Sequence, residues 1–175
     1  MATTYDKRTI AELVDGTLPW PQLKEMMSNY KDPERFDVYL EVLQEKVPWE
    51  DRILLPIGPH LFIVQRPDGE IVTKSRNGFD FGDYRENWKL KARMFVRDSD
   101  EAYQEIYPKM MHANPEWMEI REFYDPSDGT LLAVDAVPPG HPIVHDFEPD
   151  LEGFYQEWLG RSFPPDSKDQ ESGRR

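Results

Sequence analysis

Hydrophobic positions in the first 48 residues recur at the three- and four-residue spacing of short helices. The apolar faces are Ile10, Leu13 and Val14, then Leu23, Met26 and Met27, and finally Phe36, Leu40 and Leu43. Gly16 supplies a left-handed stop after the first helix, and Pro21 suits the first turn of the second. Asp-Pro-Glu at 32–34 is a start signal for the third, which Pro48 ends. Helices this short must dock on other parts of the chain.

The spacing then changes to that of strands. Strands are predicted at 53–55, 61–64, 71–73, 90–96, 117–124 and 131–137. Pro-Asp-Gly at 67–69 predicts a hairpin turn between the second and third of these. A helix is predicted from about Ser99 to Tyr107, with acidic residues in its first turn and Pro108 after it. The pattern as a whole favours an α+β fold, in which short helices lead into a small antiparallel sheet.

The C-terminal part begins with a proline-rich linker at 138–142, which cannot be helical. Asp150 is positioned to cap a last short helix that carries Phe154 and Trp158. We therefore expect one domain over residues 1–163. It comprises a helical part (1–48), a mainly β part (51–137) and a docking segment (138–163), and is followed by a disordered tail at 164–175.

Charge and hydropathy narrow the class of partner. The 175 residues carry 34 Asp and Glu against 21 Lys and Arg, a net charge of −13. Such a field repels phosphate backbones and anionic lipids, which argues against nucleic-acid and membrane binding. No apolar run approaches the ~20 residues of a membrane span, and the N-terminus has no apolar signal core. A cytoplasmic location is expected, and the many aromatic residues beside charges favour a protein partner.

Two segments resemble the ligand loops of a zinc ribbon without the ligand thiols. The first covers 74–82 and contains Asn-Gly at 77–78; the second, 124–130, places Asp125 and Asp128 at the spacing of a Cys-x-x-Cys knuckle. The chain has no cysteine, so no tetrahedral sulfur site can form. The two aspartates could hold a hard cation together with Asp80 and Asp83. Turn formation is the simpler explanation, because Asp before Pro and before Gly is typical of turns.

No catalytic centre is visible in the sequence. It lacks a glycine-rich phosphate loop, a nucleophile elbow and a dinucleotide fingerprint. His141 and His145 are four residues apart, but Pro142 prevents the helix that would align them on one face. His60 and His112 stand alone, and local hydrogen bonding accounts for such histidines. We expect no catalytic, cofactor-binding or metal-binding residue in this chain.

Ten ordered segments resemble the small (gamma) subunit family of acetone carboxylase. They are KDPERF at 31–36, VLQEKVPW at 42–49, LLPIGP at 54–59, LFIVQ at 61–65, NWKL at 87–90, EIYP at 105–108, IREF at 120–123, VHDF at 144–147, PD at 149–150 and EGFYQEWLG at 152–160. No single segment is diagnostic, but their combination in unchanged order is specific.

The resemblance implies a cytoplasmic, multi-subunit enzyme that uses ATP to join a ketone and bicarbonate into a 3-oxoacid. ATP and a divalent metal are expected in two larger partner subunits, alpha and beta, whereas this chain has a structural role. The interface residues expected from it are Trp88, Phe147, Phe154, Tyr155 and Trp158. The alternatives are a stand-alone acidic protein-binding module, the small subunit of a related acetophenone carboxylase or hydantoinase-type complex, and, with least support, an independent hydrolase.

The chain departs from the family where its counterparts have cysteines. The vacated positions are Ser75, Asn77, Gly82, Asp125 and Asp128. Their joint replacement indicates coordinated loss of a metal, so we expect another way of holding the two loops. Packing of Phe79, Phe81 and Tyr84 between the loops is the hypothesis, at roughly 25 cal/mol per Å² of buried apolar surface.

Overall fold

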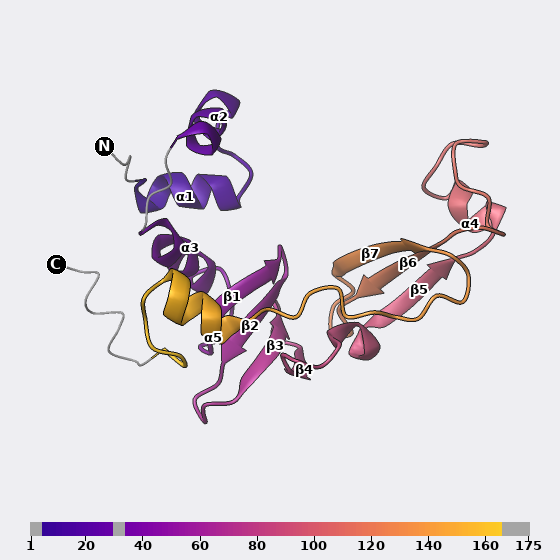
Figure 1. Cartoon of the computed structure of the whole chain (residues 1–175). Coiled ribbons are helices and arrows are strands. Elements are labelled where there is room, and N and C mark those ends of the chain that lie inside the picture. The colour runs from indigo at the N-terminus through magenta and orange to yellow at the C-terminus, as the bar shows by residue number, and fades with distance from the viewer. Residues whose placement is uncertain (1–4, 30–33, 166–175) are drawn as a thin grey trace. The chain divides into compact units, whose positions relative to one another are not determined.

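A computed structural model of the chain describes residues 5–29 and 34–165 (Figure 1). The chain divides into two compact units, Met1–Val144 and His145–Arg175. No helix within the described ranges has the length and apolar character needed to cross a membrane.

The three predicted N-terminal helices are present. They are α1 (Lys7–Val14), α2 (Trp20–Ser28) and α3 (Arg35–Gln44). The Asp6 carboxylate caps α1 by accepting a 2.8 Å hydrogen bond from the Thr9 amide, and Pro21 lies in the first turn of α2 as predicted. The predicted start signal at 32–33 lies outside the described residues. α3 ends at Gln44, four residues before the expected stop at Pro48.

A small core holds these helices together. Ile10, Leu18, Met26 and Val42 are buried against one another. Each helix has only one or two fully buried positions, so none could be stable without its neighbours.

The first sheet has four antiparallel strands in the order β1-β2-β3-β4. These are β1 (Arg52–Gly58), β2 (Leu61–Gln65), β3 (Ile71–Ser75) and β4 (Asp80–Asp83). β2 is buried along four of its five residues because α3 lies against this sheet. Leu43 of α3 packs with Ile53, Phe62, Val64 and Val72. The hairpin predicted at 67–69 joins β2 to β3, whereas the short polar β4 was not predicted.

The second sheet has three antiparallel strands in the order β5-β6-β7. These are β5 (Arg93–Arg97), β6 (Glu119–Tyr124) and β7 (Leu131–Val137), with α4 (Asp100–Gln104) between the first two. The alternating pattern at 90–96 predicted a longer strand. The Asn87 carboxamide instead caps a 3₁₀ turn, Trp88–Lys91, by accepting a 3.1 Å hydrogen bond from the Lys89 amide. The α+β class with antiparallel pairing is confirmed, but the strands form two sheets rather than one.

The C-terminal unit contains a short helix. α5 (Leu151–Gly153) continues into one π-helical turn, Phe154–Trp158. The predicted Asp150 cap is confirmed, since its carboxylate accepts a 2.9 Å hydrogen bond from the Gly153 amide. The Tyr155 ring lies 5.6 Å from the ring of Phe163. Most of the predicted disordered tail, residues 166–175, lies outside the described residues.

Candidate functional site

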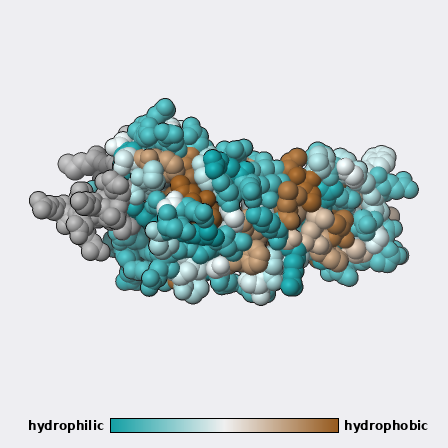
Figure 2. All heavy atoms as spheres, turned by 90° about the horizontal axis from the view of Figure 1, so that it is seen from below, coloured by the Kyte–Doolittle hydropathy of each residue, from teal (hydrophilic) through white to brown (hydrophobic). Residues whose placement is uncertain are grey.

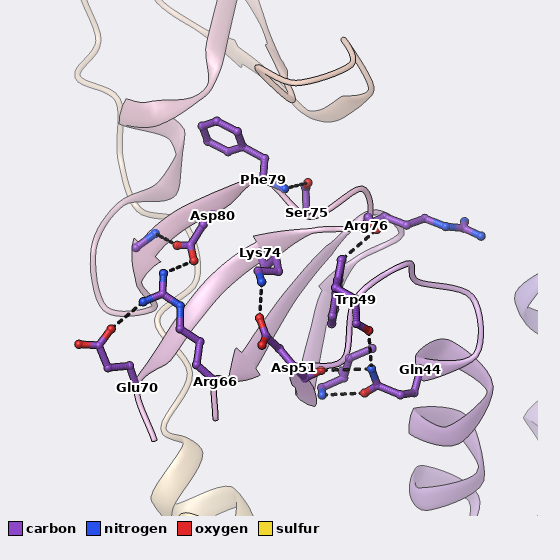
Figure 3. A network of polar contacts seen from close by, with 12 residues as sticks. Gln44, Trp49, Asp51, Arg66, Glu70, Lys74, Ser75, Arg76, Phe79 and Asp80 are labelled. Atoms are coloured by element: carbon purple, nitrogen blue, oxygen red, sulfur yellow. Dashed lines mark hydrogen bonds and ion pairs between the residues drawn. The ribbon is translucent and has the colours of Figure 1, made fainter. Parts of the chain in front are cut away.

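The first turn, residues 75–79, joins β3 to β4 (Figure 3). The Ser75 side chain is buried, and its hydroxyl accepts a 3.0 Å hydrogen bond from the Phe79 amide. The Ser75 amide donates to the Phe79 carbonyl at 2.9 Å. Gly78 has φ +102°, a conformation that residues with a side chain rarely adopt. The Asn-Gly pair therefore supplies the backbone reversal that closes this turn.

A network of polar contacts ties the first turn to the helices (Figure 3). The Trp49 indole N–H donates to the Arg76 carbonyl at 3.1 Å. The Gln44 side chain bridges α3 and β1 by donating to the Asp51 carbonyl at 3.1 Å and accepting from the Ile53 amide at 3.0 Å. Asp51 in turn forms an ion pair with Lys74 of β3. The backbone of the turn is thus fixed from the side of α3 as well as from the sheet.

The second turn, residues 125–130, joins β6 to β7. Its first carboxylate, Asp125, is buried and accepts hydrogen bonds at Oδ1 from the Ser127 amide (2.7 Å) and hydroxyl (2.6 Å). Asp128 accepts hydrogen bonds from the Thr130 amide (2.9 Å) and hydroxyl (2.8 Å). Gly129, at φ +78°, permits the reversal. Both aspartates act as turn residues here, as the simpler of the two explanations predicted.

The two turns meet through a hydrogen bond from the Asn77 carboxamide N–H₂ to the Asp128 carboxylate. The residues are 51 positions apart and belong to different sheets. Asp128 has a pKa below its usual value because the Thr130 amide and hydroxyl donate to it, and Asn77 adds a third donor. Asp128 is therefore a carboxylate acceptor at neutral pH and attracts a neutral amide donor from the first turn.

An aromatic cluster connects the two sheets. Phe81 of β4, Trp88 and Phe123 of β6 are all buried and follow one another edge to face, with ring centroids 5.7 and 6.2 Å apart. Phe79 joins the row at 4.9 Å from Phe81. The hypothesis that Phe79 and Phe81 contribute to holding the loops agrees with this packing. Tyr84 does not belong to the cluster, and its ring lies instead against the Arg85 guanidinium.

A buried ion pair reinforces the junction on its polar side. The Lys89 ammonium, whose side chain is 1% exposed, lies 2.8 Å from the Asp135 carboxylate of β7. The same ammonium lies 5.1 Å from the centre of the Phe123 ring. Because Lys89 belongs to the turn that enters the second sheet, the ion pair fixes that turn on the face of β7.

The donor set of the two turns does not fit tetrahedral zinc. There is no thiol, Ser75 is engaged with a backbone amide, and Asp125 Oδ1 with Ser127. No group of three or more His, Cys, Asp or Glu residues within 5–29 and 34–165 is arranged to hold a metal. Among the same residues, Asp125 Oδ2 is buried without a hydrogen-bond partner, the least satisfied polar atom of the second turn.

Four of the five predicted vacated positions lie in the two turns, at Ser75, Asn77, Asp125 and Asp128. Gly82 lies in β4 opposite Thr73, with φ +84°. The carboxylates considered as additional cation ligands are paired elsewhere, Asp80 with Arg66 and Asp83 with Arg85. A cation site shared by all four aspartates is therefore not formed.

The predicted interface residues differ in exposure. Trp158 is 81% and Phe147 53% exposed, whereas Trp88 and Tyr155 are buried. Phe154 is half-buried and contacts the Tyr155 and Trp158 rings. Contact of these residues with a partner stays a prediction.

Sequence reasoning missed an apolar segment after α4. Met110, Met111 and Trp117 are 89%, 72% and 77% exposed. Figure 2 shows hydrophobic patches on an otherwise largely hydrophilic face of the molecule. The density of methionine and tryptophan at 110–118 was a signal for it, but spacing alone does not distinguish exposed from buried apolar residues.

Comparison with known proteins gives two matches. Residues 47–159 match the family model described as acetone carboxylase gamma subunit. A curated relative from Xanthobacter autotrophicus (strain ATCC BAA-1158 / Py2), named acetone carboxylase gamma subunit, is 50% identical over 161 residues. The aligned region covers 91% of this chain and 96% of the relative.

Proposed function

The chain belongs to the acetone carboxylase gamma subunit family, and from that premise we propose that it is a non-catalytic small subunit of a multi-subunit carboxylase. The observation that carries the proposal is the 50% identity to a relative of that name across almost the full length of both chains. The alignment covers 96% of the relative, so no large part of that subunit is missing from this chain or replaced in it.

The reaction proposed for the complex is the ATP-dependent joining of a ketone and bicarbonate into a 3-oxoacid. Nucleotide binding, the divalent metal and the carbon–carbon bond formation are assigned to two larger subunits. This chain's own residues have a different chemistry, since the polar groups of the two turns accept and donate hydrogen bonds within and between the turns. Groups committed in this way position backbone rather than react.

We assign the joined turns the role of a metal-free brace. The Asn77–Asp128 hydrogen bond, the aromatic row through Trp88 and the Lys89–Asp135 ion pair together hold the two sheets in one arrangement. Large subunits would then meet a surface of fixed shape. Preorganised surfaces bind more tightly because less conformational entropy is lost on association.

Exposed aromatic and methionine side chains supply the contact chemistry of the proposed subunit. Trp117, Met110 and Met111 lie on one segment, and Trp158 on another. Tryptophan is among the residues that contribute most to binding energy at interfaces, and contiguous exposed apolar surface is uncommon on monomers.

Purification of the tagged chain from its native host tests the proposal. We expect two larger polypeptides to co-purify in fixed ratio, and the complex to incorporate labelled bicarbonate into an organic acid when given acetone and ATP. Recovery of the chain by itself from cells growing on a ketone would contradict a subunit role.

A second assay separates the subunit role from the non-catalytic role. The purified chain without its companions is given acetone, bicarbonate and ATP, beside the intact complex as control. Turnover by the chain by itself would refute the assignment of catalysis to the larger subunits. Stoichiometric zinc in the purified chain, measured by elemental analysis, would refute the metal-free brace.

A further inference from the structure

A cavity of about 1110 Å³ lies between the three N-terminal helices and the first sheet. All of its described lining residues come from positions 10–76, and neither turn residue of the Asn77–Asp128 hydrogen bond contributes. Its volume slightly exceeds the ~300–1,000 Å³ of small-molecule sites. The cavity is thus separate from the contacts that hold the two turns together.

The body of the cavity is apolar. Leu13 of α1, Met26 and Met27 of α2, Phe36 of α3, Ile57 of β1 and Phe62 of β2 all line it. Met27 is 68% exposed, so the cavity is open to solvent beside α2. A flexible hydrocarbon chain suits such a wall, because methionine side chains adapt to the shape of what they contact.

In the described lining of the cavity, the Arg and Lys side chains have no acidic counterpart. This lining includes Arg35, Lys46 and Arg76, together with His60, but no Asp or Glu, although the chain has 34 Asp and Glu and 21 Lys and Arg. The Lys46 ammonium is neutralised by Asp15 at 2.7 Å. No carboxylate among the described residues pairs with the Arg76 guanidinium, which Figure 3 shows directed away from the polar network of the sheet.

His60 and Arg76 form one basic edge of the cavity. The Arg76 amide donates to the His60 carbonyl at 2.9 Å, which places the turn between β1 and β2 beside the turn that follows β3. The Trp49 indole fixes the Arg76 backbone from the other side at 3.1 Å. The main chain of Arg76 is therefore held at this edge by contacts that leave the charge of its guanidinium unused.

We propose that this cavity binds an amphipathic organic anion, with a linear apolar tail among the helices and a carboxylate head at His60 and Arg76. The tail replaces water on the apolar wall, and the head accepts charge-assisted hydrogen bonds from Arg76. An amphiphile with a cationic head lacks that partner and meets like charge instead.

Methyl NMR of the full chain labelled at methionine provides the test, with dodecanoate at monomeric concentrations as the probe. The chain has seven methionines, of which Met26 and Met27 line the cavity. We expect saturable shifts at these two methyls and none at the exposed Met110 and Met111. Across decanoate, undecanoate and dodecanoate, affinity should rise about fourfold per added methylene.

Variants identify the head-group site. Arg76→Gln should weaken dodecanoate binding roughly tenfold, the loss expected for one charge-assisted hydrogen bond at a partly exposed site. Arg93→Gln removes the same charge from the exposed start of β5 and should leave the affinity unchanged. The methyl spectrum of each variant shows directly whether the fold is retained.

Four results would overturn the proposal. Three of them are shifts confined to methionines outside the cavity, equal binding of dodecyltrimethylammonium, and equal loss of affinity in Arg93→Gln and Arg76→Gln. Absence of any response to dodecanoate at Met26 and Met27 would also refute it, because these methyls lie in the wall that the tail must contact.

Discussion

Replacing Trp88 by alanine distinguishes a core role from the interface role that the sequence suggested for this residue. The Trp88 side chain is 8% exposed and contacts Phe81 and Phe123 edge to face. Trp158, the matched control, is 81% exposed. If exposure decides which residue is in the core, Trp88→Ala lowers the free energy of unfolding of the isolated chain and Trp158→Ala does not.

The magnitudes follow from the buried area. A tryptophan buries at most roughly 250 Å², which at about 25 cal/mol per Å² corresponds to ~6 kcal/mol. The unfolded chain already buries part of this area, so a cost of about 3–5 kcal/mol is expected for Trp88→Ala. Trp158 buries about one fifth of its surface, which gives roughly 1 kcal/mol or less for Trp158→Ala.

Urea unfolding of the isolated full chain, followed by far-ultraviolet circular dichroism, measures both costs. Thermal melts should show a decrease of roughly 6–20 °C for Trp88→Ala, at about 2–4 °C per kcal/mol for a chain of this size. Trp158→Ala should leave the melting temperature nearly unchanged and weaken recovery of the larger polypeptides from the host. A cost below 1 kcal/mol for Trp88→Ala would refute the assignment of Trp88 to the core.

Three further substitutions test the contacts described above. Glu122→Gln should cost about 1–2 kcal/mol at pH 7, because the buried Arg97 guanidinium loses the charge of its 2.8 Å partner and keeps Glu105 at 2.7 Å. The hydrogen bond from Arg97 lowers the pKa of Glu122, so the stability that ionised Glu122 contributes is fully present above about pH 4.3 and is lost as the pH falls through the lowered pKa. Urea unfolding should therefore show the stabilities of the variant and the wild type converging in acid. A stability difference that does not depend on pH would contradict this. Asn77→Ala should speed amide hydrogen exchange in the turn of Asp128 but not in the first sheet, and unchanged exchange would show that the hydrogen bond does not hold the turns. Gly78→Ala should lower the free energy of unfolding by about 1–2 kcal/mol, because its φ of +102° is unfavourable for alanine; equal stability of the two proteins would count against that backbone conformation.

Local patterns predicted the elements well where one residue type enforces a backbone conformation. The Asp150 cap, Pro21 in the first turn of α2 and the glycine turn at 67–69 were all confirmed. The pattern failed where tertiary contacts decided the outcome. The alternation at 90–96 predicted a strand from residue 90, but the Asn87 cap and the burial of Trp88 hold residues 88–91 in a 3₁₀ turn. β4 carries little apolar signal, and its pairing to β3 depends on a register shift at Lys74.

In the candidate site, too, the sequence predicted what local preferences decide and missed what distant contacts decide. Asp125 and Asp128 were identified as turn residues because Asp-Pro and Asp-Gly pairs have local preferences that need no partner. The hydrogen bond between Asn77 and Asp128 spans 51 positions, and no local preference encodes it. The same limit applies to the all-basic edge of the cavity, since His60 and Arg76 become neighbours only through the pairing of strands around them.

The amino-acid sequence therefore determined the family, the α+β class, the short helices and the two turns, because each depends on residues close together in the chain or on their order. The folded chain decided that the strands form two sheets, that Trp88 lies in the core while Trp158 is exposed, and that Arg35, Lys46, His60 and Arg76 line one cavity. Exposure and charge environment are properties of surfaces brought together from distant segments. They depend on the contacts between those segments and not on the composition of any one of them.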